Sequence, residues 1–330
     1  MTLDRRQALL LAAACSLAAI VPAAIVPAGA ADQDFATWLA AFKAEAIAQG
    51  IRKETVEAAF VGVEPIPHVL ELDRRQPETT ITFTTYVQRV VTADRVEAGR
   101  RHLAENRKLL DEVGARYNVQ PRFIVALWAV ESGFGVVMGD FNVVAALATL
   151  AYDGRRGAFF RKELIAALKI LDQGHFQPGE LKGSWAGAMG QTQFMPSSFL
   201  SYAVDYNGNG RQDIWTDHAD VFASIANYLK SCGWNGAIGW GRAVKLPKRF
   251  DSTALDGKTL KTVDGWRALG VRRSDGGELP HADLEAGLVQ PGGTAGPTLM
   301  TYGNYRAIMK WNHSLYFATA VSYLADRFES

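Results

Sequence analysis

The stretch Gly183–Ser198 constrains this chain more than any other, because its composition suits neither a regular helix nor a regular strand. Three glycines and two alanines keep the backbone bare, which would let a large ligand approach it closely. The remaining side chains are serine and threonine hydroxyls, glutamine amides and apolar groups without formal charge. Such a surface suits an uncharged polyol such as a sugar chain. The alternative is a glycine-rich loop that only packs tightly.

A second stretch, residues 121–135, predicts a helix with a carboxyl on its buried side. Pro121 suits the first turn, and Gly133 and Gly135 would end the helix. At helical spacing Glu131 shares a face with three apolar residues, Ile124, Leu127 and Trp128. A buried carboxyl is costly to ionise, so its pKa is expected to rise, as a general acid for a glycosidic oxygen requires. The alternative is a solvated residue at a frayed helix end.

These two motifs together resemble the catalytic core of the lytic murein transglycosylases, specifically the B family. The similarity extends from about Asp32 to the C-terminus. Five further segments occur in the family's order: 84–86, 145–150, 203–215, 226–228 and 311–314. The resemblance implies a mainly α (α+β) fold, with a lysozyme-like helical core, an added helical subdomain and a small β-containing insertion.

The predicted organisation combines this resemblance with the pattern of helix and turn signals. Residues 1–30 are predicted to be an export signal and residues 31–330 the catalytic region. Within the catalytic region the predicted parts are a helical N-terminal part (31–120), the lysozyme-like core (121–238 and 304–330) and the insertion (239–303). Glycine and proline recur in the insertion, and short runs at 242–246, 287–290 and 298–302 predict strands there.

The resemblance also implies the reaction. The enzyme would cleave the β-1,4 bond between N-acetylmuramic acid (MurNAc) and N-acetylglucosamine (GlcNAc) in peptidoglycan and leave 1,6-anhydro-MurNAc ends, with no cofactor for catalysis. Glu131 would be the single general acid and base. The substrate-binding residues carried over by motif position are Tyr86, Ser184, Gln193, Tyr228 and Asn312. For the two tyrosines, ordinary core packing is the alternative.

Two other functions stay open on the sequence. A hydrolytic muramidase of the same fold would need a second catalytic acid, for which Asp140 and Asp153 are the nearest candidates in sequence. Neither lies in a context that predicts burial. A non-catalytic peptidoglycan-binding protein would gain nothing from a buried carboxylate at Glu131.

The segment Asp205–Gly210 matches the opening of a calcium-binding loop. Oxygen-bearing side chains occupy positions one, three and five, and glycine occupies position six. The predicted ligands are Asp205, Asn207, Asn209, the backbone carbonyl of Arg211, and Asp220. The resemblance implies that Asp220 completes the site, as in a similar loop of the family. Such an ion would be structural. The alternative is an Asn-Gly turn without metal.

Charge argues against a nucleic-acid partner. Without residues 1–30 the chain has 33 basic and 33 acidic residues, and a neutral protein has no general attraction for nucleic acid. The predicted partner is the peptidoglycan glycan strand, with cell-wall enzyme complexes as further partners. The protein is expected to be a monomer.

The first thirty residues predict a periplasmic protein. Arg5 and Arg6 precede an apolar run, and Ala28-Gly29-Ala30 provides a cleavage site. Export would follow either the Sec or the twin-arginine route. Cys15 leaves an outer-membrane lipoprotein as the alternative, although the residues before it match a lipidation site poorly. If the signal is removed after Ala30, Cys15 is lost with it and Cys232 is alone in the mature chain, which excludes an intramolecular disulfide.

Overall fold

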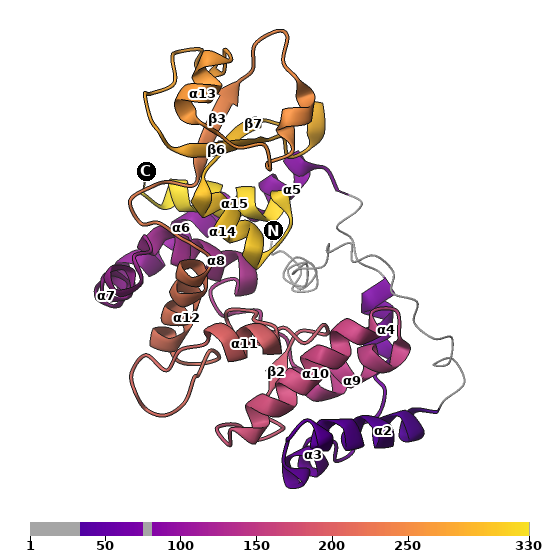
Figure 1. Ribbon diagram of the computed structural model, residues 1–330. Coiled ribbons are helices and arrows are strands. Elements are labelled where there is room, and N and C mark those ends of the chain that lie inside the picture. The colour runs from indigo at the N-terminus through magenta and orange to yellow at the C-terminus, as the bar shows by residue number, and fades with distance from the viewer. Residues whose placement is uncertain (1–33, 75–80, 330) are drawn as a thin grey trace. The chain divides into compact units, whose positions relative to one another are not determined.

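The computed structural model describes residues 34–74 and 81–329 (Figure 1). The predicted export signal lies outside these residues. The described chain forms two compact units: 34–74 with 128–225 is the first unit, and 81–127 with 226–329 is the second. The chain passes between them inside two helices, α8 (Pro121–Ser132) and α12 (His218–Ser231). Most of the regular structure is helical, which confirms the mainly α prediction. No helix of the described residues is both long and apolar enough to span a membrane.

The first unit is built around two packed helices, α9 (Val143–Asp153) and α10 (Gly157–Asp172) (Figure 1). Its other helices are α2 (Phe35–Ala48), α3 (Lys53–Ala59), α4 (Pro67–Arg74) and α11 (Pro196–Tyr202). Helix α4 packs against α9, while α3 and α11 pack against α10. Two short antiparallel strands, β1 (Phe141–Asn142) and β2 (Lys182–Gly183), join the loops before and after this pair of helices.

Local sequence explains where the central helices begin and end. Asn142 caps α9, because its Oδ1 accepts a hydrogen bond from Ala145 N at 3.0 Å. Gly154 ends α9 in the left-handed conformation, with φ 81°. On α10 the buried Glu163 accepts hydrogen bonds from Ser197 N at 2.9 Å and Ser197 Oγ at 2.8 Å. This contact fixes the start of α11 and therefore the end of the glycine-rich segment.

The second unit combines helices with an antiparallel sheet. Its helices are α5 (Phe83–Val90), α6 (Ala93–Glu105), α7 (Arg107–Tyr117), α13 (Val263–Ala268), α14 (Gly303–Trp311) and α15 (Leu315–Glu329). Its strands are β3 (Gly241–Lys245), β4 (Lys261–Thr262), β5 (Arg272–Arg273), β6 (Glu285–Val289) and β7 (Thr298–Thr301). The strand order is β4-β6-β7-β3-β5. In the register of the central strands, Thr301 pairs with both Gly241 and Gly287.

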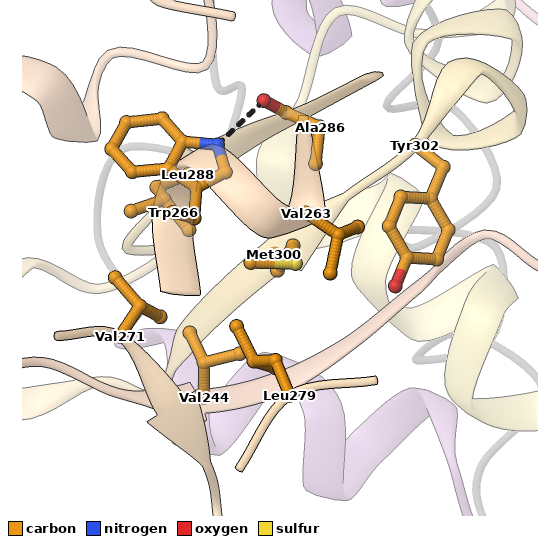
Figure 2. Packing of buried hydrophobic residues seen from close by; sticks show 9 residues of the cluster. All are labelled: Val244, Val263, Trp266, Val271, Leu279, Ala286, Leu288, Met300 and Tyr302. Carbon is orange, nitrogen blue, oxygen red and sulfur yellow. Dashed lines mark hydrogen bonds between the residues drawn. The ribbon is translucent and has the colours of Figure 1, made fainter. Parts of the chain in front are cut away.

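The sheet covers a core of its own around Trp266 of α13 (Figure 2). Trp266 is fully buried, and its indole Nε1 donates a hydrogen bond to Ala286 O at 2.8 Å (Figure 2). The neighbours in this core are aliphatic, methionine and tyrosine side chains from β3, β6, β7, α13 and the connecting loops: Val244, Val263, Val271, Leu279, Leu288, Met300 and Tyr302. This region is therefore held by apolar burial with one buried indole hydrogen bond.

Local hydrogen bonds also set two helix ends in the second unit. Helix α5 begins at Phe83, because Thr82 Oγ1 accepts a hydrogen bond from Thr85 N and caps it. The helical stretch between Ala93 and Tyr117 is divided into α6 and α7 at Asn106. The side-chain amide of Asn106 donates to His102 O at 3.0 Å, and this local hydrogen bond competes with helix continuation.

Candidate active site

Glu131 lies in the last turn of α8, and its side chain is buried, with only 1% of it exposed. The apolar residues predicted to share its face are buried to the same degree: Ile124, Leu127 and Trp128. The helical spacing therefore placed the carboxyl correctly on the buried stripe rather than at a solvated helix end.

The backbone turns sharply directly after Glu131. Gly133, Phe134 and Gly135 all have left-handed conformations, with φ of 57°, 63° and 80°. For Phe134 this conformation costs about 1–2 kcal/mol. Ser132 Oγ bridges the turn, because it donates to Trp128 O at 3.3 Å and accepts from Gly135 N at 3.0 Å. The Phe134 ring meets the Trp128 ring edge-on, with centroids 5.3 Å apart. These contacts hold the end of α8 in one conformation.

The loop that follows α8 brings the two sequence motifs together. Gln193 Nε2 donates a hydrogen bond to Met138 O at 3.1 Å. A Cβ atom on Gly139 would lie 2.2 Å from Gly183 O, so the two backbones are in direct contact there. The motif around Glu131 and the glycine-rich segment thus form one structure, although about fifty residues separate them in sequence.

Gln191 joins the same two motifs and was not among the predicted site residues. Its Oε1 accepts a buried hydrogen bond from Trp128 Nε1 at 2.7 Å, and its Nε2 donates to Trp215 O at 2.8 Å. A Cβ on Gly135 would lie 2.5 Å from Gln191 Oε1. The Gln191 amide therefore supports α8 one turn before Glu131 and the turn after it. No local sequence signal reveals this pairing, because the two partners are 63 residues apart.

The glycines of the segment 183–198 serve the packing of the protein itself. A Cβ on Gly183 would lie 2.2 Å from Ala188 O, and one on Gly190, where φ is 60°, would lie 2.6 Å from Ile214 O. The expectation that these glycines leave the backbone open to a ligand is wrong at both positions. Their lack of a side chain instead lets the segment fold tightly onto neighbouring backbone.

Ser184 and Gln193 present the polar groups of this segment. They are 9% and 4% exposed. Ser184 Oγ accepts from Ala188 N at 3.1 Å, and Gln193 Nε2 also donates to Gly190 O at 2.8 Å. Within the described chain, no group donates to Gln193 Oε1 and none accepts the Ser184 hydroxyl proton. One acceptor and one donor therefore remain for a ligand.

Tyr228 and Asn312 lie together in the second unit. The Tyr228 hydroxyl donates to Lys310 O at 2.8 Å, and its ring centroid is 4.6 Å from that of Trp311. Asn312 ends α14 and is 2% exposed; its Oδ1 accepts from Ser314 N at 3.0 Å. The end of α14 is thus fixed against α12.

Tyr86, on α5, is also a residue of the second unit. It is 6% exposed, and its ring lies 5.7 Å from that of Tyr316. Tyr86 and Tyr228 are both buried to the extent of core residues. Their packing alone is therefore compatible with the structural role that the sequence left open for them.

The family model described as the transglycosylase SLT domain matches residues 34–326. The chain belongs to this family. Membrane-bound lytic murein transglycosylase B of Escherichia coli (strain K12) is 31% identical to it over 288 residues, which is 82% of this chain and 77% of that protein. The chain is a lytic murein transglycosylase, an enzyme of peptidoglycan.

Solved structures of similar proteins extend the comparison to the fold. SltB3 of Pseudomonas aeruginosa, in complex with NAG-anhNAM-pentapeptide, is 44% identical with a TM-score of 0.86, over 90% of this chain and 80% of that one. SltB1 of the same organism is 29% identical with a TM-score of 0.79, over 88% and 98%. Escherichia coli Slt35 in complex with calcium is 28% identical with a TM-score of 0.75, over 88% and 92%. The transglycosylase therefore has the lysozyme-like fold that the sequence predicted.

The predicted calcium loop of the transglycosylase is organised by its own side-chain oxygens. Asp205 accepts three backbone N–H groups, from residues 208–210, at 2.7–3.1 Å. Asn207 Oδ1 accepts from Asn209 N at 3.0 Å, and Asn209 Oδ1 accepts from Arg211 N at 2.9 Å. The loop is thus wound around these three side chains.

Asp220 closes the loop from the first turn of α12. It is fully buried, and its two oxygens accept from Tyr206 N at 2.8 Å and Asp213 N at 2.7 Å. Burial raises the pKa of Asp220 to about 6, and the charges of Asp217 and Asp205 contribute to the rise. No group of three or more His, Cys, Asp or Glu side chains in the described chain is arranged to hold a metal. Of the predicted ligands only Asp205 and Asp220 are carboxylates.

Proposed function

We propose that this transglycosylase cleaves the MurNAc-β-1,4-GlcNAc bond of peptidoglycan and forms 1,6-anhydro-MurNAc ends, with Glu131 as its single general acid and base. The observation that carries the proposal is the burial of the Glu131 carboxyl, only 1% exposed, at a rigid helix end. A carboxyl removed from water keeps its proton more readily, as the acid that protonates a glycosidic oxygen requires.

The proposed reaction balances without water. Glu131 donates its proton to the oxygen that links the two sugars, and the bond from that oxygen to the anomeric carbon of MurNAc breaks. The Glu131 carboxylate then takes the proton of the MurNAc 6-hydroxyl while this oxygen bonds to the same anomeric carbon. The anhydro ring is complete, and Glu131 is protonated again. The acetamido group of the substrate would assist departure in place of a protein nucleophile.

The other acids around this part of the first unit favour a single catalytic carboxyl. Asp140 is exposed, and Asp153 pairs with Arg74 at 3.2 Å. Glu163 is buried but is used to fix the start of α11 through Ser197. Each therefore has a setting that argues against a role as the second carboxylate of a hydrolytic muramidase.

We further propose that Ser184, Gln193, Tyr86, Tyr228 and Asn312 bind the glycan. The hydroxyl proton of Ser184 and Oε1 of Gln193 are suited to sugar hydroxyl or acetamido groups. The tyrosines would contribute aromatic faces along the strand. Gln191 is proposed as a positioning residue, because the two ends of its side-chain amide bond Trp128 and Trp215 and so support the turns before and after Glu131.

The test is digestion of purified sacculi by the protein without residues 1–30 and by its Glu131→Gln variant. Released muropeptides are weighed by mass spectrometry. The expected products of the active protein are lighter by one water than hydrolytic products, and Glu131→Gln should release none. Asp140→Asn is the matched control, because it makes the same chemical change at an exposed acid nine residues further along the chain.

The outcomes separate the alternatives. Products with ordinary reducing ends would make the enzyme a hydrolytic muramidase. Glu131-independent release would remove Glu131 from the mechanism. Absence of any product from the unmodified protein would favour a peptidoglycan-binding protein that does not cleave.

A second proposal concerns calcium: we infer a structural Ca²⁺ site formed by Asp205, Asn207, Asn209, the carbonyl of Arg211, and Asp220. Carboxylate, amide and carbonyl oxygens are the ligands that calcium prefers, and they lie in a loop that is already wound. The raised pKa of Asp220 supports the site, since acidic groups confined together favour a cation between them. The similar Escherichia coli Slt35 has been solved in complex with calcium.

The calcium proposal is tested by thermal unfolding in EDTA and in excess calcium. At about 100 times its dissociation constant, a bound ion stabilises the folded state by about 2.7 kcal/mol. Asp205→Asn should remove this response, while Asp283→Asn, at an exposed acid of the second unit, should keep it. An identical unfolding temperature in EDTA and calcium, with no heat of binding in calorimetry, would reject the site.

We also propose export to the periplasm through residues 1–30. The Escherichia coli relative is named as membrane-bound, and Cys15 offers a lipid anchor as the alternative. Cell fractionation of a reporter fused to residues 1–30 tests export. Replacement of both Arg5 and Arg6 by lysine should stop it only on the twin-arginine route, and labelling with a radioactive fatty acid would reveal a lipoprotein.

A further inference from the structure

The turn that ends α8 contains a residue in a conformation that its side chain disfavours. Three non-glycine residues of the described chain have positive φ: Asn118, Phe134 and Gln193. Asn118 is the C-cap of α7, and asparagine tolerates the left-handed region well. Phe134, with φ 63°, has a bulky side chain that does not, and it follows Glu131 by three residues. Strained residues of this kind persist only where the surrounding contacts hold them, and they cluster at functional sites.

Phe134 is the one position of the turn that suits an aromatic ring. A Cβ on Gly133 would have no atom within 4 Å, so a side chain there would start in open space. A Cβ on Gly135 would lie 2.5 Å from Gln191 Oε1, so a side chain there has no room. The chain therefore places its ring between the two glycines, at the residue where a bulky side chain has a conformational cost.

The partner of the Phe134 ring is a fixed group. The rings of Phe134 and Trp128 meet edge-on, with centroids 5.3 Å apart and planes at 84°. Trp128 is 1% exposed, and its Nε1 donates to Gln191 Oε1 at 2.7 Å. Its ring also meets that of Phe222, at 5.1 Å. A ring pair of this geometry stabilises by about as much as the left-handed conformation of one residue costs, so the contact can hold Phe134 in place.

The turn held in this way encloses Glu131. Trp128 and Phe134 lie three residues before and three residues after Glu131, so their contact closes the chain around it. Phe134 N also donates to Trp128 O at 3.3 Å, so the backbone and the ring of Phe134 both contact the same residue. Val136, just beyond the turn, is 82% exposed, so the outer side of the turn lies in solvent. The anchor of the turn is on its inner side.

We propose that Phe134 is a positioning residue for Glu131: its ring, docked on Trp128, holds the left-handed turn that fixes the catalytic carboxyl in its buried position. The inference rests on the proposed role of Glu131 as general acid and base. Without the ring, an L-amino acid at position 134 would leave the left-handed region, and the last turn of α8 would loosen. The carboxyl would then lose its alignment with the glycosidic oxygen, and a misplacement of about 1 Å can lower a rate by about 10²-fold.

The test compares replacements of Phe134 by kcat and KM on soluble glycan strands, per folded molecule, with the folded fraction taken from urea unfolding. Phe134→Ala should lower kcat roughly tenfold with KM changed by less than about twofold, because alignment and not binding is lost. Phe134→Gly also lacks the ring but adopts the left-handed conformation freely, so it should be at least about threefold faster than Phe134→Ala. Phe134→Tyr keeps the ring and should retain most of the rate.

Phe35→Ala is the matched control. Phe35 is a half-buried ring of the same unit and meets Tyr152 edge-on at 5.3 Å, but it lies in a right-handed helix, α2. Its removal should leave kcat per folded molecule unchanged. If Phe134→Ala does not fold, Phe134→Leu takes its place in the comparison with Phe134→Gly, because leucine keeps much of the apolar volume but not the ring pair.

Three results would overturn the inference. If Phe134→Gly is as slow as Phe134→Ala, the left-handed turn does not position Glu131. A raised KM with unchanged kcat would mean that the ring contacts the glycan instead. An equal fall of kcat in Phe35→Ala would be a general effect of losing a ring pair. Glu131→Gln separates the two proposals: if it stays active, the proposed function fails, and if it is inactive while Phe134→Ala is fully active, only this inference fails.

Discussion

Residues 183–198 and the sheet-bearing residues 241–301 are both rich in glycine, but they bury different kinds of side chain. In the first region the buried set includes four polar residues: Ser184, Gln191, Thr192 and Gln193. In the second it is dominated by the apolar neighbours of Trp266 (Figure 2). Polar burial of the first kind adds little net stability, but it fixes atoms in one arrangement, because every unmade hydrogen bond is costly.

This contrast assigns different tasks to the two regions. The sheet region obtains its stability from area removed from water, which tolerates conservative exchange of apolar groups. The segment 183–198 and the end of α8 obtain a defined geometry from hydrogen bonds such as that between Trp128 and Gln191. Substitutions in the first unit near Glu131 should therefore reduce the reaction rate, and substitutions around Trp266 should reduce the free energy of unfolding.

The largest effect is expected at Glu131. Glu131→Gln should lower kcat by about a thousandfold, because general acid–base catalysis contributes about 10²–10⁴ in rate. The free energy of unfolding should stay within about 1 kcal/mol of the unmodified protein, since the amide occupies the same volume without a charge to bury. Turnover on sacculi and urea unfolding measure the two quantities. A stability loss of several kcal/mol would show that the site also stabilises the fold, and the contrast would fail.

Trp266→Ala should give the opposite pattern. Truncation of a fully buried tryptophan costs about 3–5 kcal/mol of stability, whereas the rate per folded molecule should be unchanged. Trp266→Phe keeps most of the apolar contact but leaves Ala286 O without its donor, so a smaller loss is expected. If kcat of the folded Trp266→Phe variant fell as strongly as that of Glu131→Gln, the sheet region would have a part in catalysis.

The same contrast explains which features the sequence could predict. Helix α8 was predictable because proline at its start, glycines after its end and the apolar period are all local signals. The strands β3, β6 and β7 lie at the predicted runs for the same reason. Helix α9 was not predicted as a helix: it is buried on nearly every side, so its apolar run has no amphipathic period.

Long-range contacts set the limit of the prediction at the site. The burial of Glu131 followed from its own helix, but the role of Gln191 depends on Trp128 and Trp215, which only the folded chain brings to it. The glycines at 183 and 190 were correctly singled out but given the wrong reason, because their crowding neighbours come from residues 188 and 214. The composition indicates that these positions need glycine, but it does not identify the residues that pack against them.

Gln191→Met is expected to have an effect of intermediate size, and it tests whether hydrogen bonds in the first unit position Glu131. It keeps the volume but removes the hydrogen bonds that the Gln191 amide forms with Trp128 Nε1 and Trp215 O. We expect a loss of about 2 kcal/mol of stability and a fall of roughly tenfold in kcat, with KM for the glycan unchanged. Trp128→Phe breaks the same hydrogen bond from the other end. In the double variant the two effects on kcat should be less than additive, and additive effects would remove Gln191 from the positioning of Glu131.

The smallest expected effect is a pH dependence of opposite sign in the two regions. Hydrogen bonds from neighbouring residues hold the pKa of three exposed carboxyls in the sheet region below the usual range, namely Asp251, Asp256 and Asp275. Their contribution to stability is lost only as the pH falls through those low values. The pKa of Asp220 in the first unit is shifted in the opposite direction, because burial raises it to about 6.

Between pH 5 and 7.5 the carboxyls of the sheet region stay ionised, so Asp220 should dominate the difference between the unmodified protein and Asp220→Asn. In EDTA, the folded state binds a proton at Asp220 near pH 6 that the unfolded chain binds only near pH 4, so the free energy of unfolding should rise as the pH is lowered from 7.5 to 5, by about 1–2 kcal/mol. Urea unfolding at each pH measures this slope, and Asp220→Asn should flatten it. A slope that is the same in both proteins would mean that Asp220 is not the titrating group. Burial of this carboxyl would then not lower the free energy of unfolding at neutral pH.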